Sequence, residues 1–255
     1  MRAIVRDKGF SLNIPEAVEK EAQRIGKGYP ARFKEEERIR RDFRGVLTFT
    51  IDPDDAKDFD DALSFKEISR DLFEIGVHIA DVSFFVEEGS VLDTEAAERG
   101  TSIYLVDRTI PMLPEILSND LASLVPGKDR LAFSAVFHIT REGVVKERWF
   151  GRSIICSTKR FTYRTAQDAL DDLAGQYHPE LALLDTIAKK FRAKRVAEGA
   201  LTFDQEEIKF ELNAEGKPIR IYKKERLETN KLIEDFMILA NVEVATFVSK
   251  KDELL

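Results

Sequence analysis

The protein is 255 residues long, with 43% hydrophobic and 34% charged side chains, a composition typical of one large or two small globular domains. No apolar run approaches the ~20 residues of a membrane span, and the N-terminal residues carry charges where a signal segment would be apolar. The single Cys156 excludes an intrachain disulfide. These features predict a cytoplasmic protein with no membrane partner.

The charge of the chain is unevenly distributed. Against 40 Lys and Arg stand 47 Asp and Glu, and the resulting net charge of −7 by itself disfavours a nucleic-acid partner. However, residues 41–129 hold 20 acidic and 8 basic side chains, a net charge of −12, whereas the rest of the chain carries +5. The excess of negative charge therefore belongs to one segment.

Helices are predicted where apolar residues recur every three or four positions. These segments are residues 15–25, 94–99, 179–196 and 229–250. The first belongs to an N-terminal lead-in helix and linker, residues 1–41, and is expected to stop at Gly26-Lys27-Gly28, because glycine disfavours helix. Gly100 predicts a similar stop for the second helix.

Strands are predicted where apolar and polar side chains alternate between turn-forming residues. These segments are residues 46–51, 62–66, 72–79, 131–140, 144–157, 201–212 and 218–222. After the first, they pair as three hairpins around short polar turns, and a proline-bearing loop occupies residues 107–129. The predicted fold class is α+β, with a mixed, largely antiparallel sheet and packed helices.

The most informative stretch is acidic and lies at residues 52–61, where six aspartates stand within ten residues against one lysine. Like charges this close raise one another's pKa unless a cation compensates them, and short carboxylates suit Mg²⁺ or Mn²⁺. A solvated acidic loop is the alternative. Because Asp52 ends an apolar strand and Phe59 and Ala62 interleave with the later acids, the run is expected to be anchored beside a core.

Other acidic and catalytic motifs fit less well. An EF-hand loop starting at Asp58 would need Asp or Asn where Ala62 stands, and glycine where Leu63 stands. The run from Asp54 to Asp58 matches a DDxxD motif of helical prenyl-diphosphate synthases, but Pro53 after a strand opposes a helix. The sequence has no glycine-rich phosphate loop, HExxH pair, CxxC pair or GxSxG elbow, so zinc and serine-hydrolase chemistry lack support.

Several ordered motifs carry a resemblance to a known family. They are TIDPDDAKDFDDAL at residues 50–63, HIADVS at 78–83, YLVDRTIPMLP at 104–114 and LIEDFMILAN at 232–241. These residues resemble the catalytic RNB domain of the ribonuclease II and ribonuclease R family over roughly residues 42–248. The resemblance implies a metal-dependent, hydrolytic 3′-to-5′ exoribonuclease that acts on single-stranded RNA and releases nucleoside 5′-monophosphates.

The resemblance also assigns roles to residues. The family's four motif aspartates fall on Asp52, Asp58, Asp60 and Asp61, which are then expected to hold Mg²⁺ or Mn²⁺ at the RNA 3′ end. Asp60 is expected to be indispensable for hydrolysis. Two ions about 4 Å apart can lower the pKa of an attacking water and stabilise the departing 3′ oxygen. Tyr104 matches the tyrosine that positions the terminal nucleotide; a half-buried strand aromatic is the alternative interpretation.

Further positions also have two interpretations. Asp81 is either a turn-forming aspartate or a contributor to catalysis. Glu234 and Asn241 share one face of the last helix, and either line an RNA channel or cap a polar seam. Basic residues gather at residues 189–195 and 223–226, where they either neutralise phosphates or form a solvated face.

The resemblance does not extend over the whole of the family's architecture. The family's flanking cold-shock and S1 modules have no counterpart, nor does its Ser-Pro-Ile-Arg-Arg-Tyr stretch with the active-site arginine, so the RNB-like domain at residues 42–255 is predicted to be C-terminally incomplete. That arginine, which would stabilise transition-state charge, would then come from the missing remainder of a split enzyme. The alternative function is a non-catalytic RNA-binding or assembly module that retains the acidic site.

Overall fold

The computed structural model describes residues 5, 7–106, 108–201, 207–213, 217–223 and 225–250, and the chain forms two compact units. Unit 1 comprises Met1–Arg38, Asp81–Ser123 and Asp204–Glu225. Unit 2 comprises Ile39–Ala80, Leu124–Phe203 and Arg226–Leu255. Within the described residues, no helix has both the length and the apolar character needed to cross a membrane.

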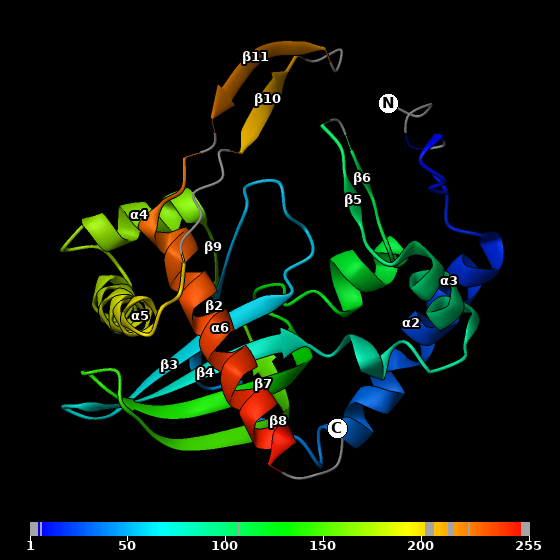
Figure 1. The fold of residues 1–255 in the computed structure, drawn as a ribbon. Coiled ribbons are helices and arrows are strands. Elements are labelled where there is room, and N and C mark those ends of the chain that lie inside the picture. The colour runs from blue at the N-terminus through cyan, green and yellow to red at the C-terminus, as the bar shows by residue number, and fades with distance from the viewer. Residues whose placement is uncertain are drawn as a thin grey trace. The chain divides into compact units, whose positions relative to one another are not determined.

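Unit 2 is built on a seven-stranded sheet with the strand order β1-β8-β7-β4-β3-β2-β9 (Figure 1). Its strands are β1 (Arg41–Asp42), β2 (Leu47–Asp52), β3 (Asp61–Ser69), β4 (Leu72–Ala80), β7 (Asp129–Thr140), β8 (Val145–Cys156) and β9 (Lys159–Thr162). Neighbouring strands are antiparallel except at the two edges, where β1 pairs with β8 and β9 pairs with β2 in parallel. The predicted α+β class with a mixed, largely antiparallel sheet is confirmed.

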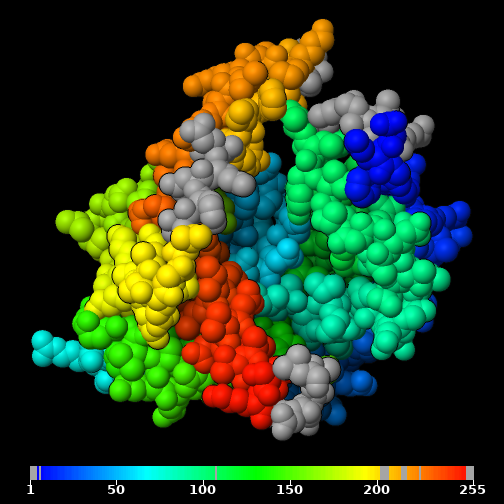
Figure 2. All heavy atoms as spheres, viewed as in Figure 1, coloured from blue at the N-terminus to red at the C-terminus, as the bar shows by residue number. Residues whose placement is uncertain are grey.

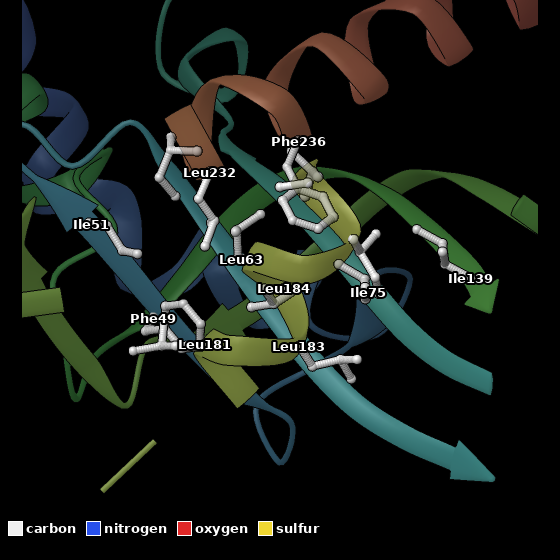
Figure 3. Close-up of a cluster of buried hydrophobic side chains, with 14 of the residues drawn as sticks. Phe49, Ile51, Leu63, Ile75, Ile139, Leu181, Leu183, Leu184, Leu232 and Phe236 are labelled. Atoms are coloured by element: carbon white, nitrogen blue, oxygen red, sulfur yellow. The ribbon is translucent and has the colours of Figure 1, made fainter. Parts of the chain in front are cut away.

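Three helices cover one face of this sheet: α4 (Tyr163–Asp171), α5 (His178–Ala197) and α6 (Glu228–Ser249). Figure 2 shows α5, in yellow, and α6, in orange to red, side by side at the surface of unit 2. Alternate strand residues such as Phe49, Leu63 and Ile75 meet Leu184 and Phe236 from the helices (Figure 3). Full burial of each such side chain contributes about 1.5–3 kcal/mol to stability.

The opposite face of the sheet in unit 2 combines small and polar side chains with the aromatic ring of Phe43, which lies 5.2 Å from that of His78. The Nδ1 atom of His78 on β4 lies 2.6 Å from the Ser134 hydroxyl on β7. Gly76 is required here, because a Cβ atom would lie 2.4 Å from the Ser64 hydroxyl and 2.6 Å from His78 Nε2. Burial lowers the pKa of His78 to about 3, and the positive charge of Arg41 acts in the same direction. His78 is therefore a neutral, buried histidine.

Unit 1 combines helical and short extended elements. They are α2 (Glu16–Glu36), η1 (Val82–Phe84), α3 (Val91–Arg99), β5 (Ile103–Tyr104), β6 (Thr109–Ile110), η2 (Leu117–Leu121), β10 (Ile208–Leu212) and β11 (Pro218–Lys223). Arg99 fixes the N-terminal segment, because its guanidinium donates to Asn13 O at 2.7 Å and to Glu95 at 2.7 Å. The predicted helix stop at Gly100 is confirmed, since this glycine has φ 68° at the end of α3.

The predicted stop at Gly26-Lys27-Gly28 is wrong. Helix α2 runs through these residues and through Pro30. The reason is packing within unit 1: a Cβ atom at Gly26 would lie only 3.2 Å from Ile116 Cδ1 and 3.4 Å from Leu121 Cδ1. Gly26 thus permits close approach, and tertiary packing overrides its low helix propensity.

The hairpins β3–β4 and β7–β8 and the helices α5 and α6 follow the sequence pattern closely. Several other elements were missed, among them β6 and η2, which lie within the predicted proline-bearing loop at residues 107–129. Strand β9 and helix α4 lie where the pattern predicted neither a strand nor a helix. In the third hairpin, residues 202–206 lie outside the described residues, and β10 begins at Ile208. The segment of β9 and α4 matters for function, because it borders the acidic stretch described next.

Candidate active site

The acidic loop, defined as residues 53–60, joins β2 to β3. Asp52 is the last residue of β2 and Asp61 is the first residue of β3, so both carboxylates stand at the same end of two antiparallel neighbours. The loop backbone is held within unit 2, because Leu124 N donates to Phe59 O and Ala80 N donates to Asp60 O, both at 2.9 Å. The loop therefore has one rigid end beside the sheet.

The predicted anchoring of this loop beside a core is confirmed. Phe59 and Ala62 are both buried, although they alternate with aspartates. Burial of these two side chains keeps the following carboxylates close to the end of the sheet. A freely solvated acidic loop is therefore excluded.

Asp52 and Asp61 are carboxylates that protein atoms shield from water. Asp52 is only 6% exposed, and this burial raises its pKa to about 7, with the negative charges of Asp61 and Asp60 adding to the effect. Burial likewise raises the pKa of Asp61 to about 6, and Asp60 adds to it. The Oδ2 atoms of Asp52 and Asp61 are buried and have no hydrogen-bond partner among the described residues.

Asp60 and Asp58 lie on the more solvated side of the same loop. Asp60 is exposed, yet the surrounding protein raises its pKa to about 6, and the negative charge of Asp58 contributes. Asp58 is half-buried. Because water screens Asp60 more than Asp52, the electrostatic penalty of ionisation is greatest at Asp52.

The chemistry of these donors fits a hard divalent cation. The site offers carboxylate oxygens, two of them buried and unbonded, whose charges nothing in their surroundings fully compensates. A bound cation would favour the ionised forms and reverse the pKa shifts. Among the described residues, however, no three His, Cys, Asp or Glu side chains stand close enough together to hold a metal ion. Asp52, Asp58, Asp60 and Asp61 remain predicted ligands.

Two residues near the aspartates were not found from the sequence. Arg160 on β9 donates through Nη2 to the carbonyl oxygens of Pro53 and Asp54, the latter at 3.1 Å. Tyr163 begins α4, and its pKa is raised to about 12 by burial and by the negative charges of Asp61 and Asp52. One signal was present: Thr162 and Thr165 have the spacing of a helix cap, which marks the start of α4.

Tyr104 and Asp81 belong to unit 1. Tyr104 lies on β5 opposite Thr109 and is 68% exposed, so the interpretation as a half-buried strand aromatic is wrong. Asp81 is buried and caps η1, since its Oδ1 atom accepts from the Ser83 hydroxyl at 2.7 Å and from Phe84 N at 3.2 Å. These contacts favour the turn-forming interpretation of Asp81.

The helix α6 carries Glu234 and Asn241 on its exposed side. Glu234 forms an ion pair with Arg226, which precedes the helix. The residue next to Glu234, Asp235, points the other way and is only 1% exposed. The seven-residue spacing therefore places Glu234 and Asn241 on one solvent-exposed face, where their roles remain predictions.

The basic residues of α5 are mostly engaged with acidic side chains. Lys189 pairs with Asp185 at 2.7 Å and Lys190 pairs with Glu142. Arg192 and Arg195 both bind Asp235 on α6. This cluster joins two helices, and neither a free phosphate-binding patch nor a merely solvated face describes it.

Comparison with known proteins shows which family the chain belongs to. A family model described as the RNB domain matches residues 40–255. The chain belongs to the RNB domain family. It is 42% identical over 236 residues to DIS3-like exonuclease 2 of Xenopus tropicalis, a match that covers 86% of the chain and 28% of that relative. It is 41% identical over 233 residues to Inactive exonuclease DIS3L2 of Arabidopsis thaliana, with 85% of the chain and 22% of that relative covered.

A solved structure confirms the fold. Mycoplasma genitalium RNase R, in complex with ribose-methylated single-stranded RNA, superposes on the RNB chain with a TM-score of 0.86 and 27% identity. The match covers 98% of this chain and 39% of RNase R. The chain thus spans well under half the length of these relatives.

Proposed function

We propose that this chain is the catalytic core of a metal-dependent 3′-to-5′ exoribonuclease, which hydrolyses single-stranded RNA to nucleoside 5′-monophosphates in the cytoplasm. The observation that carries the proposal is the group of shielded carboxylates at the joined ends of β2 and β3, within a sequence of the RNB family. The names of the relatives, which include exonucleases and RNase R, support the same reaction class.

The aspartates and Tyr104 would have different roles in this reaction. Asp52, Asp58, Asp60 and Asp61 would hold Mg²⁺ or Mn²⁺, which when bound would supply an activated water and stabilise the departing 3′ oxygen. Shielding of Asp52 and Asp61 from water strengthens their interaction with any bound cation. The exposed ring of Tyr104 offers a stacking surface for the terminal base.

The test uses 5′-end-labelled single-stranded RNA with Mg²⁺ or Mn²⁺ and the purified chain. We expect shortening by single nucleotides from the 3′ end, with nucleoside 5′-monophosphates as the products. Asp60→Asn should lower the rate by at least about a hundredfold, because it removes a charge from the reacting centre. Asp55→Asn is the matched control, since Asp55 lies on the same loop, is exposed and has no counterpart in the family motif. Equal loss in both variants would contradict the assignment.

A non-catalytic RNA-binding or assembly module is the second candidate. It is favoured by the likeness to a relative named as an inactive exonuclease, and by the absence, among the described residues, of a preformed three-ligand group. In the same assay this function would appear as a band shift of the labelled RNA without shortening. That result, at metal concentrations that stabilise the fold, would overturn the exoribonuclease proposal for this chain.

A further inference from the structure

Arg160 makes its contacts with the two halves of the acidic loop. At the start of the loop, its Nη2 atom donates to Pro53 O and, at 3.1 Å, to Asp54 O. Near the end of the loop, its guanidinium carbon lies 5.5 Å from the centre of the Phe59 ring, in a cation–π arrangement. One side chain from the edge strand β9 thus spans the loop that carries the predicted ligands.

The acceptors of the Arg160 hydrogen bonds indicate the role of this side chain. The positive charge of Arg160 acts on the nearby Asp52, yet the hydrogen bonds from Arg160 Nη2 go to backbone carbonyl oxygens and not to a carboxylate. Its Nε atom is buried and has no partner among the described residues. The Oδ2 atoms of Asp52 and Asp61 consequently stay unbonded. Arg160 holds the backbone of the loop and leaves these carboxylate oxygens available.

The loop backbone needs such a support. A turn hydrogen bond within the loop runs from Ala56 N to Pro53 O at 3.2 Å, and Phe59 O accepts from Leu124 N further along. Asp58 lies between these points of the loop backbone. Arg160 binds the same Pro53 oxygen that closes the turn, and packs on the ring of Phe59.

We infer that Arg160 is a positioning residue, which fixes the acidic loop so that Asp58 and Asp60 are presented together with Asp52 and Asp61. The role as metal ligands rests on the proposed function, whereas the support of the loop is independent of it. A planar guanidinium can donate to two carbonyl oxygens and stack on a ring at once, and an ammonium group cannot reproduce this geometry.

The decisive comparison is between geometry and charge. Arg160→Gln removes the charge and the guanidinium together, while Arg160→Lys keeps the charge and loses the planar group that reaches the two carbonyl oxygens and the Phe59 ring at once. Lys159→Gln is the matched control, because it removes a neighbouring exposed positive charge that lies over the ring of Phe161 and not over that of Phe59. Hydrogen–deuterium exchange of the peptide covering residues 53–60 reports loop order in the metal-free chain, and paramagnetic resonance of free Mn²⁺ reports metal affinity.

We expect Arg160→Lys and Arg160→Gln each to speed exchange of residues 54–60 by about tenfold, because charge-assisted hydrogen bonds to the loop are lost. Each should also weaken Mn²⁺ binding by about tenfold, since a looser loop must be ordered on binding. Exchange of the β7 amides, an internal control for global folding, should not change. Lys159→Gln should behave as wild type in both measurements.

Either of two results with the Arg160 variants would overturn the inference. If Arg160→Lys matches wild type in both measurements, only the charge matters. If Arg160→Gln binds Mn²⁺ more tightly, the arginine merely repels cations from the carboxylates. Should both Arg160 variants fail to fold, Phe59→Leu keeps the arginine and removes the ring, and unchanged exchange of residues 53–60 in that variant would equally overturn the inference.

Failure of the proposed function is separable from failure of this inference. A chain without nuclease activity can still show the loop and Mn²⁺ effects. Where the chain is active, Arg160→Lys should lower kcat by about tenfold and leave the KM for RNA within about twofold, because a positioning residue acts on the reacting centre through the ligands. A raised KM with unchanged kcat would instead indicate direct RNA contact and would overturn the positioning role.

Discussion

Among the buried aspartates of unit 2, Asp52 and Asp235 lie under opposite electrostatic conditions. Asp235 on α6 is enclosed between Arg192 and Arg195, with Arg192 donating from two nitrogen atoms at 3.0 and 2.7 Å. Asp52 at the end of β2 is similarly buried, but its Oδ2 atom has no hydrogen-bond partner among the described residues and its pKa is raised to about 7.

The difference separates a structural carboxylate from one suited to a ligand. At Asp235 the chain supplies the compensating positive charge, so the ion pair joins α5 to α6 and its removal damages the fold. At Asp52 the positive charge of Arg160 does not offset burial and the negative charges of Asp61 and Asp60, so a cation from outside the chain is what would complete the compensation. Comparable burial thus has opposite consequences, and four measurements can test this contrast.

The largest expected effect is at Asp235. Asp235→Asn should lower the free energy of unfolding by about 3 kcal/mol, because two guanidinium groups at the α5–α6 contact lose their shared partner. Urea unfolding followed by circular dichroism measures this. Lys194→Gln, which breaks the exposed Lys194–Glu198 pair at the end of α5, is the control and should cost less than about 0.5 kcal/mol. Equal costs for the two variants would contradict a special role for Asp235.

His78 adds a third buried ionisable group, one that folding keeps neutral. Its pKa in the folded state, about 3, lies below the ordinary histidine value of 6.5, so its contribution to stability is complete above pH 6.5 and is lost as the pH falls towards 3. Between pH 7 and 4.5 the loss should be about 2.5 kcal/mol.

The His78 effect is measured as a difference, because the aspartates with raised pKa values act in the opposite direction over the same range. Unfolding free energies of wild type and His78→Gln are compared at pH 7 and 4.5, so that the aspartate contribution cancels. The gap between the two proteins should narrow on acidification. A gap that stays constant would show that His78 does not titrate in this way.

The substitution that destabilises at position 235 should stabilise at position 52. In metal-free protein at pH 8, Asp52→Asn should raise the free energy of unfolding by about 1–2 kcal/mol, because it removes an uncompensated buried charge. Chelator-treated samples and urea unfolding provide the measurement. A loss of stability comparable to that of Asp235→Asn would contradict the view that the charge of Asp52 is uncompensated.

The smallest expected effect comes from metal addition. At about ten times its dissociation constant, Mn²⁺ should stabilise the native chain by about 1.4 kcal/mol and raise Tm by a few degrees. Asp52→Asn should abolish this shift, and Asp55→Asn should retain it. An unchanged Tm at millimolar Mg²⁺ and Mn²⁺ would argue against a metal site built from these aspartates.

Periodic patterns in the sequence predicted those strands and helices whose formation depends on neighbouring residues. Alternation along 131–140 and 144–157 gave the long β7–β8 hairpin, and helical spacing gave α5 and α6 within a residue or two. The acidic run also pointed to the joined ends of β2 and β3, because Asp52 follows an apolar strand and Phe59 is buried.

What the pattern missed depends on partners distant in the chain. Strand β9 has only four residues and pairs in parallel with β2, so the alternation of its own side chains is too short to indicate a strand. Arg160 and Tyr163 gain their significance only from that pairing. Gly26 was misread for the same reason, since the side chains that pack on it come from residues 116 and 121. Asp235 sits within a regular helical pattern, and only the α5–α6 contact shows that it is a buried charge.

The hydrogen bond from Arg160 to Pro53 joins residues 107 positions apart in the chain. Closing so long a segment has a large entropic cost, and contacts of this span form late in folding. During synthesis, the acidic loop stays without its support until the β9 segment has emerged and docked on β2. The group of carboxylates at the ends of β2 and β3 is therefore expected to take its final arrangement only when the sheet that carries it is complete.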